Sequence, residues 1–357
     1  MPVIPLGPED ERAARALRRT GIHHGLPATA LVAVTGPDAA RYLQAMTTQD
    51  LATLPPGGVA YAALADDRGH YLADFWVWRP GGEWVLEVAA GLATGLARRL
   101  ALFAVSDDVE IEVDEAVALF HAEGPRAVAV AEELAGAGPT AGAGVAEFAA
   151  GGAAGYVARR SRYGEAGFTF AVAVGESERF AAALGAAAGR AGLVAAGEAA
   201  RATLRLEAGR PLGGVDMTES DLLQEAGLAG AISLAKGCFP GQEILQRVAR
   251  QGALKRRLGG LVLDRAAAGA MVGGDPVEGP GGEPLGAVTS SADSPALGAA
   301  LALAWLVAGG WAGGAPVRVR TGAGLFAGRV SGLPFVGGAA GLLAETPSYP
   351  ERTPTRR

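Results

Sequence analysis

The sequence has few of the residues that build disulfides and metal sites. Its 357 residues include one cysteine, Cys238, and four histidines, at positions 23, 24, 70 and 121. One thiol excludes an intramolecular disulfide, and the histidines lack the spacing that zinc ligands show. One thiol also cannot hold a zinc ion or an iron–sulfur cluster without a partner. We therefore expect a cytoplasmic protein in a reducing compartment, with no metal site of its own.

A long uninterrupted apolar run is also missing. The N-terminal residues, MPVIPLGPEDERAARALRR, lack the apolar core of a signal peptide. Residues 295–317 carry no charge, but four glycines and Pro316 interrupt their second half. The continuous part, 297–307, is about half of the ~20 residues that a membrane span needs. We expect a buried element followed by a turn, and no membrane partner.

Positive charge is not in excess. The chain holds 31 Lys and Arg against 37 Asp and Glu, a formal net charge of −6. This balance disfavours a surface that neutralises phosphates, so direct, constitutive nucleic-acid binding is not expected. The local exception is a run of cations that is either a polyanion site or a solvated helix face. Its members are Arg247, Arg250, Lys255, Arg256 and Arg257.

Apolar residues, by contrast, make up 50% of the chain, which is too long for a single compact core. Helix and strand patterns mix without strict alternation, which favours an α+β fold. Beyond about residue 255, short strand-like segments lie between Gly and Pro turns. They predict a small C-terminal β-barrel or sandwich.

The apolar periodicity predicts individual elements. Residues 107–124 read as a strand pair, and residues 133–155, rich in Ala and Gly, read as a loop-rich connection or a degraded helix. Helices are expected within 8–21, 36–51, 90–105, 178–192 and 197–211, and strands within 58–80, 82–89 and 156–175.

Asp74 is the most unusual charge in a strand pattern. Alternation places it on the same face as Leu72 and Trp76, so it lies either in a pocket that tunes its ionisation or on a solvent face. In a predicted helix, Arg201 and Arg205 are four residues apart and share one face. They either pair with nearby glutamates or bind a carboxylate.

Cys238 lies in the segment AKGCFPGQEILQRVARQ. A thiol becomes reactive beside a cation or a helix N-terminus, and Lys236 precedes it by two residues. Cysteine is also among the most often buried residue types, so a purely structural role is the alternative. No His or Asp partner lies nearby in the sequence, which disfavours a protease-like nucleophile.

Five segments occur in an order and spacing that resemble a known folate-binding family, over about residues 28–330. They are LVAVTGPDAARYLQAMTTQDL, GVAYAALADDRGHYLADFWVW, RATLRLEAGRPLGGVDM, AGAISLAKGCFPGQEILQRV and PLGAVTSSADSPALGAALAL. The family contains the glycine cleavage T-protein, an aminomethyltransferase, and the YgfZ-type proteins of iron–sulfur cluster assembly. The string K-G-C-[YF]-x-G-Q-E is similar to the YgfZ branch, since T-proteins lack its cysteine. Its residues are Lys236, Gly237, Cys238, Phe239, Gly241, Gln242 and Glu243.

The resemblance implies an architecture. The family folds as a three-domain α+β cloverleaf around tetrahydrofolate, with a C-terminal β-barrel. We accordingly expect an aminomethyltransferase-like folate-binding region at 1–255, built of two interleaved α+β domains. The barrel is expected at 256–345 and a flexible tail at 346–357.

The resemblance also implies site residues. Asp74 matches the aspartate that contacts the reactive nitrogen of folate, although Ala73 replaces the aspartate before it. Tyr61 and Arg201 match other residues of the folate pocket, and Arg247 is expected to bind the anionic tail of the ligand. Thr169 stands where T-proteins carry a glutamate that helps grip the folate ring. The segment around Tyr163 lacks the Gly-Tyr-Thr-Gly string that T-proteins carry there.

The leading functional hypothesis is a folate-binding accessory protein for iron–sulfur cluster assembly or repair. Asp74 and Cys238 would be its reactive residues, and folate and iron–sulfur client or assembly proteins its partners. The first alternative is a folate-dependent aminomethyltransferase, and the second is a factor associated with tRNA modification. The sequence leaves open whether the chain is an enzyme, and we expect a monomer.

Overall fold

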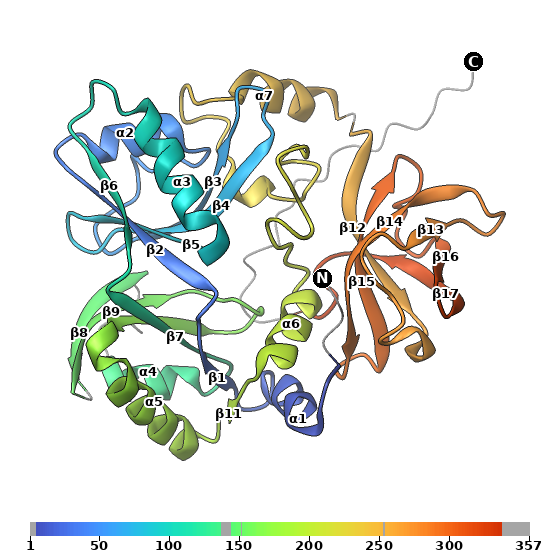
Figure 1. The fold of residues 1–357 in the computed structure, drawn as a ribbon, viewed down its shortest axis with the longest axis horizontal. Coiled ribbons are helices and arrows are strands. Elements are labelled where there is room, and N and C mark those ends of the chain that lie inside the picture. Colours follow the sequence, from blue (N-terminus) through green and yellow to red (C-terminus); the bar gives the residue numbers. More distant parts are fainter. Residues whose placement is uncertain (1–4, 137–143, 151, 253, 338–357) are drawn as a thin grey trace.

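The computed structural model describes residues 5–136, 144–150, 152–252 and 254–337. Within them, two sheets with flanking helices lie on one side and a closed β-barrel on the other (Figure 1). The expected α+β fold with a C-terminal β-barrel is confirmed. The expected flexible tail, 346–357, lies outside the described residues.

The upper sheet in Figure 1 has the strand order β3-β4-β5-β2-β6. Helices α2 (Ala39–Met46) and α3 (Ala90–Phe103) share its hydrophobic core, where Leu43 and Leu100 are fully buried. Its strands are β2 (Thr29–Thr35), β3 (Val59–Ala65), β4 (Tyr71–Trp78), β5 (Trp84–Ala89) and β6 (Glu110–Asp114).

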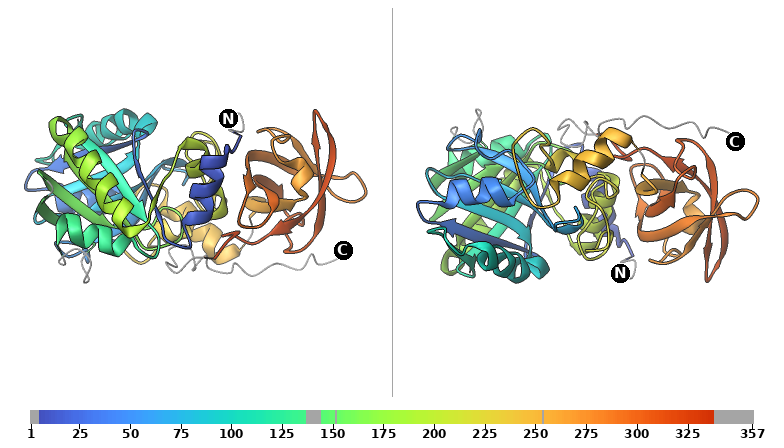
Figure 2. Two further views of the ribbon diagram at one scale, coloured as in Figure 1. Left: turned by 90° about the horizontal axis from the view of Figure 1, so that it is seen from below. Right: turned by 90° about the horizontal axis from the view of Figure 1, so that it is seen from above.

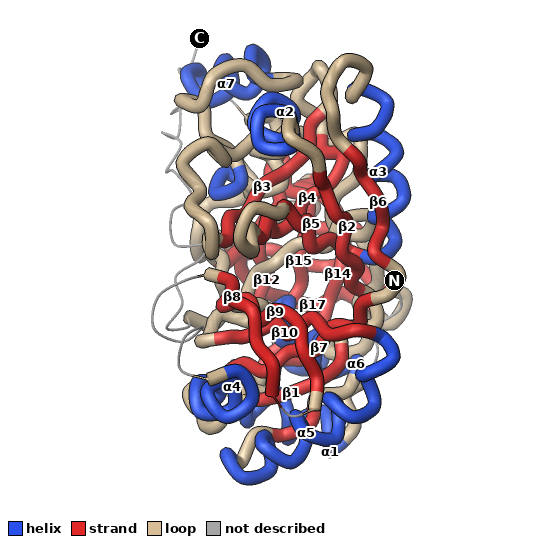
Figure 3. Tube along the Cα trace, turned by 90° about the vertical axis from the view of Figure 1, so that its left-hand side faces the viewer, coloured by secondary structure: helices blue, strands red, loops and turns tan. Residues whose placement is uncertain are grey.

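The lower sheet has the order β11-β1-β7-β10-β9-β8. Phe170 and Phe180 meet in its core, against α4 (Ala127–Ala135) and α5 (Ser177–Ala191). Figure 3 shows the two sheets one above the other, with these two helices at the lower end of the molecule. The strands are β1 (Ile22–Gly25), β7 (Val117–Glu123), β8 (Val145–Ala150), β9 (Ala153–Arg159), β10 (Gly167–Ala173) and β11 (Val194–Ala195).

The two sheets are interleaved along the chain, which corrects one expectation. Residues 107–124 form two strands, but these are not paired with each other. Strand β6 pairs with β2 in the upper sheet, whereas β7 pairs with β1 and β10 in the lower sheet. Their apolar residues explain the split, because Ile111 packs on the upper core while Ala122 lies in the lower one.

The expectation of a loop or degraded helix at 133–155 is also wrong for the residues described there. After the end of α4, the chain forms the β8–β9 hairpin, in which Val145 pairs with Ala158. Val145 and Phe148 are buried, and they provide the apolar face that the alanines between them conceal in the sequence. Residues 137–143 and 151 lie outside the described part of the chain.

The barrel closes in the order β12-β15-β14-β13-β16-β17. The uncharged segment 295–317 contributes β15 and the turn after it, as expected of a buried element followed by a turn. Among the described residues, no helix has the length and apolar character to cross a membrane. The strands are β12 (Arg256–Leu263), β13 (Pro276–Glu278), β14 (Pro284–Ser294), β15 (Ala299–Val307), β16 (Pro316–Thr321) and β17 (Gly324–Ser331).

Two helices, α1 (Pro8–Ala16) and α6 (Glu198–Glu207), lie between the sheets and the barrel (Figure 2). Arg205 of α6 forms a 2.6 Å ion pair with Asp216, whose Oδ1 accepts a hydrogen bond from Ser290 in the barrel. Glu207, also in α6, accepts hydrogen bonds from Arg18 and from Ser294 of the barrel. Helix α6 is therefore tied to the barrel at both of these residues, and the loop after it is held in place.

Candidate functional site

The candidate site is centred on Asp74 of β4. The Tyr61 hydroxyl donates a 2.7 Å hydrogen bond to Oδ2 of Asp74, and the Tyr71 hydroxyl donates one of 2.7 Å to Oδ1. Tyr61 comes from the neighbouring strand β3, and Trp76 lies 5.1 Å from it, measured between ring centroids. The structure thus brings together Tyr61 and Asp74, which the resemblance implies, and adds Tyr71 to them.

Tyr71 reaches Asp74 because strand β4 carries one extra residue. Ala73 pairs with Leu64, but the next residue of β3, Ala65, pairs with Tyr71, so Leu72 has no partner of its own. Such a bulge reverses the alternation of side chains beyond it. Tyr71 therefore lies on the same face as Asp74, and regular alternation in the sequence did not reveal it.

Burial controls the ionisation of this group. Removal from water raises the pKa of Asp74 above its ordinary value, although the hydrogen bonds from Tyr61 and Tyr71 and the charge of Arg210 oppose the rise. Burial also raises the pKa of both tyrosines, with a further contribution from the charge of Asp74. The tyrosines consequently stay protonated and act as donors to the carboxylate.

Arg210 lies close enough to Asp74 and Tyr61 for their charges to interact, and burial lowers the pKa of its guanidinium. Its Nε atom is enclosed and has no hydrogen-bond partner. The loop after it passes close to the tyrosines: a Cβ atom placed on Gly213 would lie 2.1 Å from the Tyr71 hydroxyl. Only glycine allows this approach, so Gly213 positions the loop against the Asp74 cluster.

A second charged group lies beside the first. Glu87 of β5 accepts hydrogen bonds from Arg160 and Arg162, and the Arg160 guanidinium lies 4.9 Å from the centre of the Trp76 ring. Burial alone would raise the pKa of Glu87, but the two arginines outweigh it and lower the pKa. These ion pairs join the two sheets next to Trp76, the ring that packs against Tyr61.

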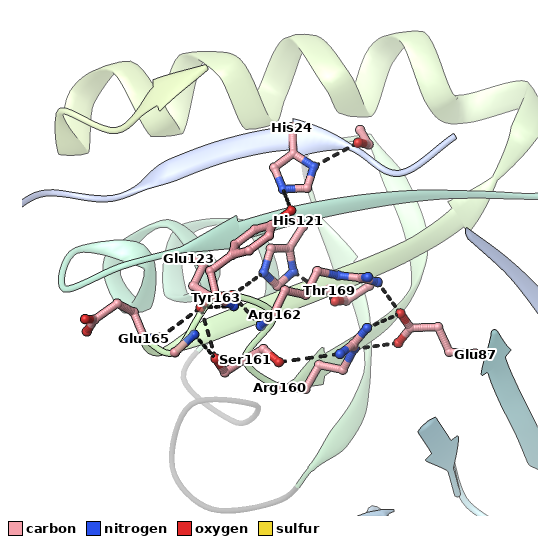
Figure 4. Close-up of polar contacts among 12 residues, drawn as sticks. His24, Glu87, His121, Glu123, Arg160, Ser161, Arg162, Tyr163, Glu165 and Thr169 are labelled. Carbon is pink, nitrogen blue, oxygen red and sulfur yellow. Dashed lines mark hydrogen bonds and ion pairs between the residues drawn. The ribbon is translucent and has the colours of Figure 1, made fainter. Parts of the chain in front are cut away.

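The lower sheet contains a buried network around Glu123 (Figure 4). His121 donates through Nε2 to Glu123 (2.8 Å) and accepts through Nδ1 from the Thr169 hydroxyl (2.9 Å). Burial lowers the pKa of His121 to about 4, so the ring is neutral near pH 7. Glu123 accepts four more hydrogen bonds, from the Ser161 hydroxyl and the backbone N–H groups of residues 162, 163 and 165. The Thr169 hydroxyl is thus used inside the protein core, where the residue is buried.

Arg201 lies in a different part of this region. It donates a 3.0 Å hydrogen bond to the backbone oxygen of Gly25 and borders a pocket of about 420 Å³. His24 also borders the pocket; its ring donates to the same Gly25 oxygen and accepts a 3.1 Å bond from Tyr163. The prediction that Arg201 binds folate stays a prediction, because no contact joins it to Asp74.

The structure gives the string around Cys238 a packing role. Lys236 donates through Nζ to the backbone oxygens of Gln44 and Thr47, at the end of α2. Phe239 is buried, and a Cβ atom on Gly241 would lie 2.4 Å from the oxygen of Asp66 in the β3–β4 turn. Gly237 has a positive φ of 98°, a conformation that favours glycine. Lys236, Phe239 and Gly241 therefore hold the turn against the upper sheet, and Gly237 allows the chain to bend there.

Other residues of the same segment face solvent. Cys238 is exposed, and Glu243 is an exposed acid in the first turn of α7 (Gln242–Gln251). Arg247 and Arg250, on the same helix, are exposed, as is Lys255 after it, whereas Arg256 and Arg257 contact other groups in the protein. The proposed roles of Cys238 in chemistry, of Arg247 in folate binding and of the cations in tRNA association all stay predictions.

No group of three or more His, Cys, Asp or Glu side chains in the described part of the chain could hold a metal ion. Sequence reasoning missed Tyr71, Arg210 and the Glu123 network. Arg210 and Glu123 had no local signal, because each meets its neighbours only through the folded chain. Tyr71 had no such signal either, because regular alternation places it on the face opposite Asp74.

Comparisons with known proteins agree with this architecture. Residues 12–236 match the family model of the GCVT N-terminal domain, and residues 256–337 match the glycine cleavage T-protein C-terminal barrel domain. A protein of Herpetosiphon aurantiacus named aminomethyltransferase is 31% identical over 290 residues, 80% of this chain and 78% of that protein. One of Thermus thermophilus, also named aminomethyltransferase, is 33% identical over 312 residues, 85% of this chain and 83% of that protein.

The fold shows the same relationship. The crystal structure of glycine cleavage system aminomethyltransferase T from Bartonella henselae matches with a TM-score of 0.80 at 25% sequence identity. The match covers 94% of this chain and 91% of that one. The two domain models and these relatives lead to one conclusion: the chain belongs to the aminomethyltransferase superfamily, with a GCVT N-terminal domain and a glycine cleavage T-protein C-terminal barrel domain.

Proposed function

We propose that the chain binds a tetrahydrofolate beside Asp74 and acts as a folate-dependent one-carbon transferase of the aminomethyltransferase type. The observation that carries this proposal is the carboxylate of Asp74, held by two tyrosine hydroxyls near Arg210, whose enclosed Nε has no hydrogen-bond partner. The relatives named aminomethyltransferase support this activity more strongly than the accessory role in iron–sulfur assembly that the string around Cys238 favours.

The residues of the site fit such a ligand. Asp74 provides acceptor atoms, and Arg210 provides donors, one of them enclosed and without a partner. Buried polar groups normally find partners, so the enclosed Nε of Arg210 is available to donate to an acceptor atom of a ligand. The partly exposed Tyr61 ring, backed by the buried Trp76 ring 5.1 Å away, supplies an apolar surface of the kind that flat ligands need.

The protein's own part in the reaction is to bind and orient. Tyr61 and Tyr71 each take one lone pair of Asp74, which fixes the plane of the carboxylate and leaves further lone pairs for an N–H group of the ligand. Burial excludes water from the carboxylate and strengthens its electrostatic interactions. When bound, tetrahydrofolate supplies the nitrogen that accepts the one-carbon unit.

One feature sets this site apart from the T-protein pattern. Thr169, at the position of the ring-gripping glutamate, directs its hydroxyl to His121 inside the lower sheet. Recognition of the folate ring by that position is therefore not part of our proposal. In this proposal, recognition of the ring or the tail falls to other residues.

The test is a pair of measurements on the purified protein. Calorimetry should detect tetrahydrofolate binding, and an assay with an aminomethylated lipoyl carrier protein should detect methylenetetrahydrofolate. Asp74→Asn should abolish transfer, while Asp67→Asn, at the exposed β3–β4 turn, should leave it unchanged. Folate binding without transfer would reject the transferase, and absence of folate binding would reject the whole proposal.

The second candidate function is an accessory role in iron–sulfur cluster assembly or repair. The specific observation in its favour is that Lys236, Phe239 and Gly241 are used to hold a turn whose Cys238 stays exposed. In a deletion strain under oxidative stress, a Cys238→Ser copy should fail to restore iron–sulfur enzymes such as radical methylthio-transferases, whereas the wild-type copy restores them. Equal rescue by both copies would remove this candidate.

A further inference from the structure

Arg210 differs from the other arginines around the site. Arg160 and Arg162 bond to Glu87, and Arg205 pairs with Asp216. The guanidinium of Arg210 donates no hydrogen bond to any residue that the structure describes, and its Nε atom is enclosed. It is a partly buried charge that the protein itself does not neutralise with an ion pair.

Such a charge is costly. A buried ion loses hydration, and nearby opposite charges that make no direct hydrogen bond to it repay only part of that loss. Burial and the positive charge of Arg160 accordingly lower the pKa of Arg210, although the charges of Glu123, Tyr61 and Asp74 oppose the shift. A residue that served only the fold would be accommodated better as an apolar side chain of similar length. The arrangement therefore indicates a partner that the chain does not contain.

The backbone on both sides of Arg210 is fixed. Its carbonyl oxygen accepts a 2.7 Å hydrogen bond from Arg205, which also binds Asp216 and, in the barrel, Ser290. Three residues further on, Gly213 lies against the Tyr71 hydroxyl. The side chain is thus presented to the Asp74 cluster from a loop that both α6 and the barrel hold in place.

We propose that Arg210 is a ligand-binding residue of the Asp74 site and donates to an acceptor oxygen of the bound folate. The inference rests on the proposed function. Arginine presents a planar set of donors that suits a carbonyl or carboxylate oxygen, while Asp74 accepts from an N–H group. Two parts of folate carry such oxygens, the carbonyl of the pterin ring and the carboxylates of the glutamate tail.

The experiment compares the wild type with Arg210→Met and Arg210→Lys by calorimetry with tetrahydrofolate. Loss of a charge-assisted hydrogen bond should weaken binding by Arg210→Met about 10- to 150-fold. Arg210→Lys keeps the charge but loses the planar guanidinium, so its affinity for tetrahydrofolate should lie between those of the wild type and Arg210→Met. Arg318→Met is the matched control, because Arg318 also has an enclosed Nε without a partner but lies in barrel strand β16. Its affinity should equal that of the wild type.

Thermal unfolding without ligand separates binding from folding. If Arg210 contacts only the ligand, Arg210→Met should unfold at the same temperature as the wild type or at a higher one. A structural role predicts the opposite, a lower unfolding temperature with unchanged folate affinity, and this result would overturn the inference. Should Arg210→Met fail to fold, the affinity of Arg210→Lys decides, and wild-type affinity in that variant rejects the inference.

Half-molecules identify the oxygen. A tetrahydropterin without the tail and p-aminobenzoylglutamate are titrated into the wild type and Arg210→Met, and the half whose binding depends on Arg210 carries the contact. The two proposals fail differently. Folate binding that is equal in the wild type and Arg210→Met rejects the role of Arg210 alone, whereas a wild type that binds no folate rejects both.

Discussion

The Tyr71 hydroxyl donates a 2.7 Å hydrogen bond to Oδ1 of Asp74, although in a regular strand residues three apart point to opposite faces. The bulge in β4 makes the contact possible. It gives the carboxylate a donor for each oxygen, and both donors oppose the effect of burial on its pKa.

Removal of the Tyr71 hydroxyl should change the pH dependence of ligand binding. The bond from Tyr71 opposes the burial that raises the pKa of Asp74, so Tyr71→Phe should raise this pKa further. If folate binding requires ionised Asp74, the variant should begin to bind folate at a higher pH than the wild type. Below the raised pKa, its affinity should be lower than that of the wild type by about 10-fold or more. Calorimetry between pH 5 and 8 tests this. Tyr156→Phe is the control, and identical pH profiles for wild type and Tyr71→Phe would contradict the prediction.

Ionised Asp74 should lower the free energy of unfolding. Its pKa is raised in the folded state, so the cost is absent at a pH below the ordinary aspartate pKa and appears as the pH rises through the folded-state value. Asp74→Asn should therefore have a larger free energy of unfolding than the wild type near pH 7, with the difference shrinking toward pH 4. Urea unfolding at both pH values measures it. A variant less stable than the wild type at pH 7 would show that Asp74 supports the fold.

Ionised Glu123, in contrast to Asp74, should raise the free energy of unfolding. Burial alone would raise its pKa, but hydrogen bonds from His121 and the backbone outweigh burial and lower it. The stability from Glu123 is thus present above the ordinary glutamate pKa and lost as the pH falls through the folded-state value. Glu123→Gln replaces one acceptor oxygen with a donor and should destabilise the protein at pH 7, because each buried donor left without an acceptor costs about 1–3 kcal/mol. Urea unfolding should show a loss several times that of Glu147→Gln, an exposed control, and equal losses would argue against the network.

Lys236 should hold the turn that carries Cys238. Its Nζ donates to two backbone oxygens at the end of α2, and Lys236→Met removes both bonds. The loss should cost about 1–3 kcal/mol, and amide hydrogen exchange should accelerate in the turn before α7. The exposed Lys255 provides a matched control, Lys255→Met. If exchange in the turn stays at the wild-type rate, Lys236 has a role other than packing.

Much of the fold could be predicted because its signals are local. The barrel strands lie between Gly and Pro turns, and the helices carry an apolar stripe every three or four residues. The pairing of β6 and β7 could not be predicted, because two adjacent strand patterns indicate a hairpin unless their separate cores are known. The β8–β9 hairpin was missed because alanine fills both of its faces and masks the alternation.

The site divides in the same way. Asp74 could be found because a carboxylate among apolar strand residues breaks the pattern, and the resemblance added Tyr61. Tyr71 depends on one extra residue in a strand, and Arg210 on a loop that folds back against β4. Neither event leaves a periodic trace in the sequence. In the segment around Cys238, spacing alone did not show that its glycines and lysine serve packing.

The interleaving of the two sheets also orders events during synthesis. Strands β2 to β6 are contiguous in the chain, so the upper sheet has all of its strands once Asp114 has left the ribosome. Strand β1 is made earlier, yet its partners β7 and β11 come later. Ile22–Gly25 is therefore made before any of its partner strands, and every strand of the other sheet is made in between. A nascent chain that ends at Asp114 would hold all the strands of one sheet and only one strand of the other.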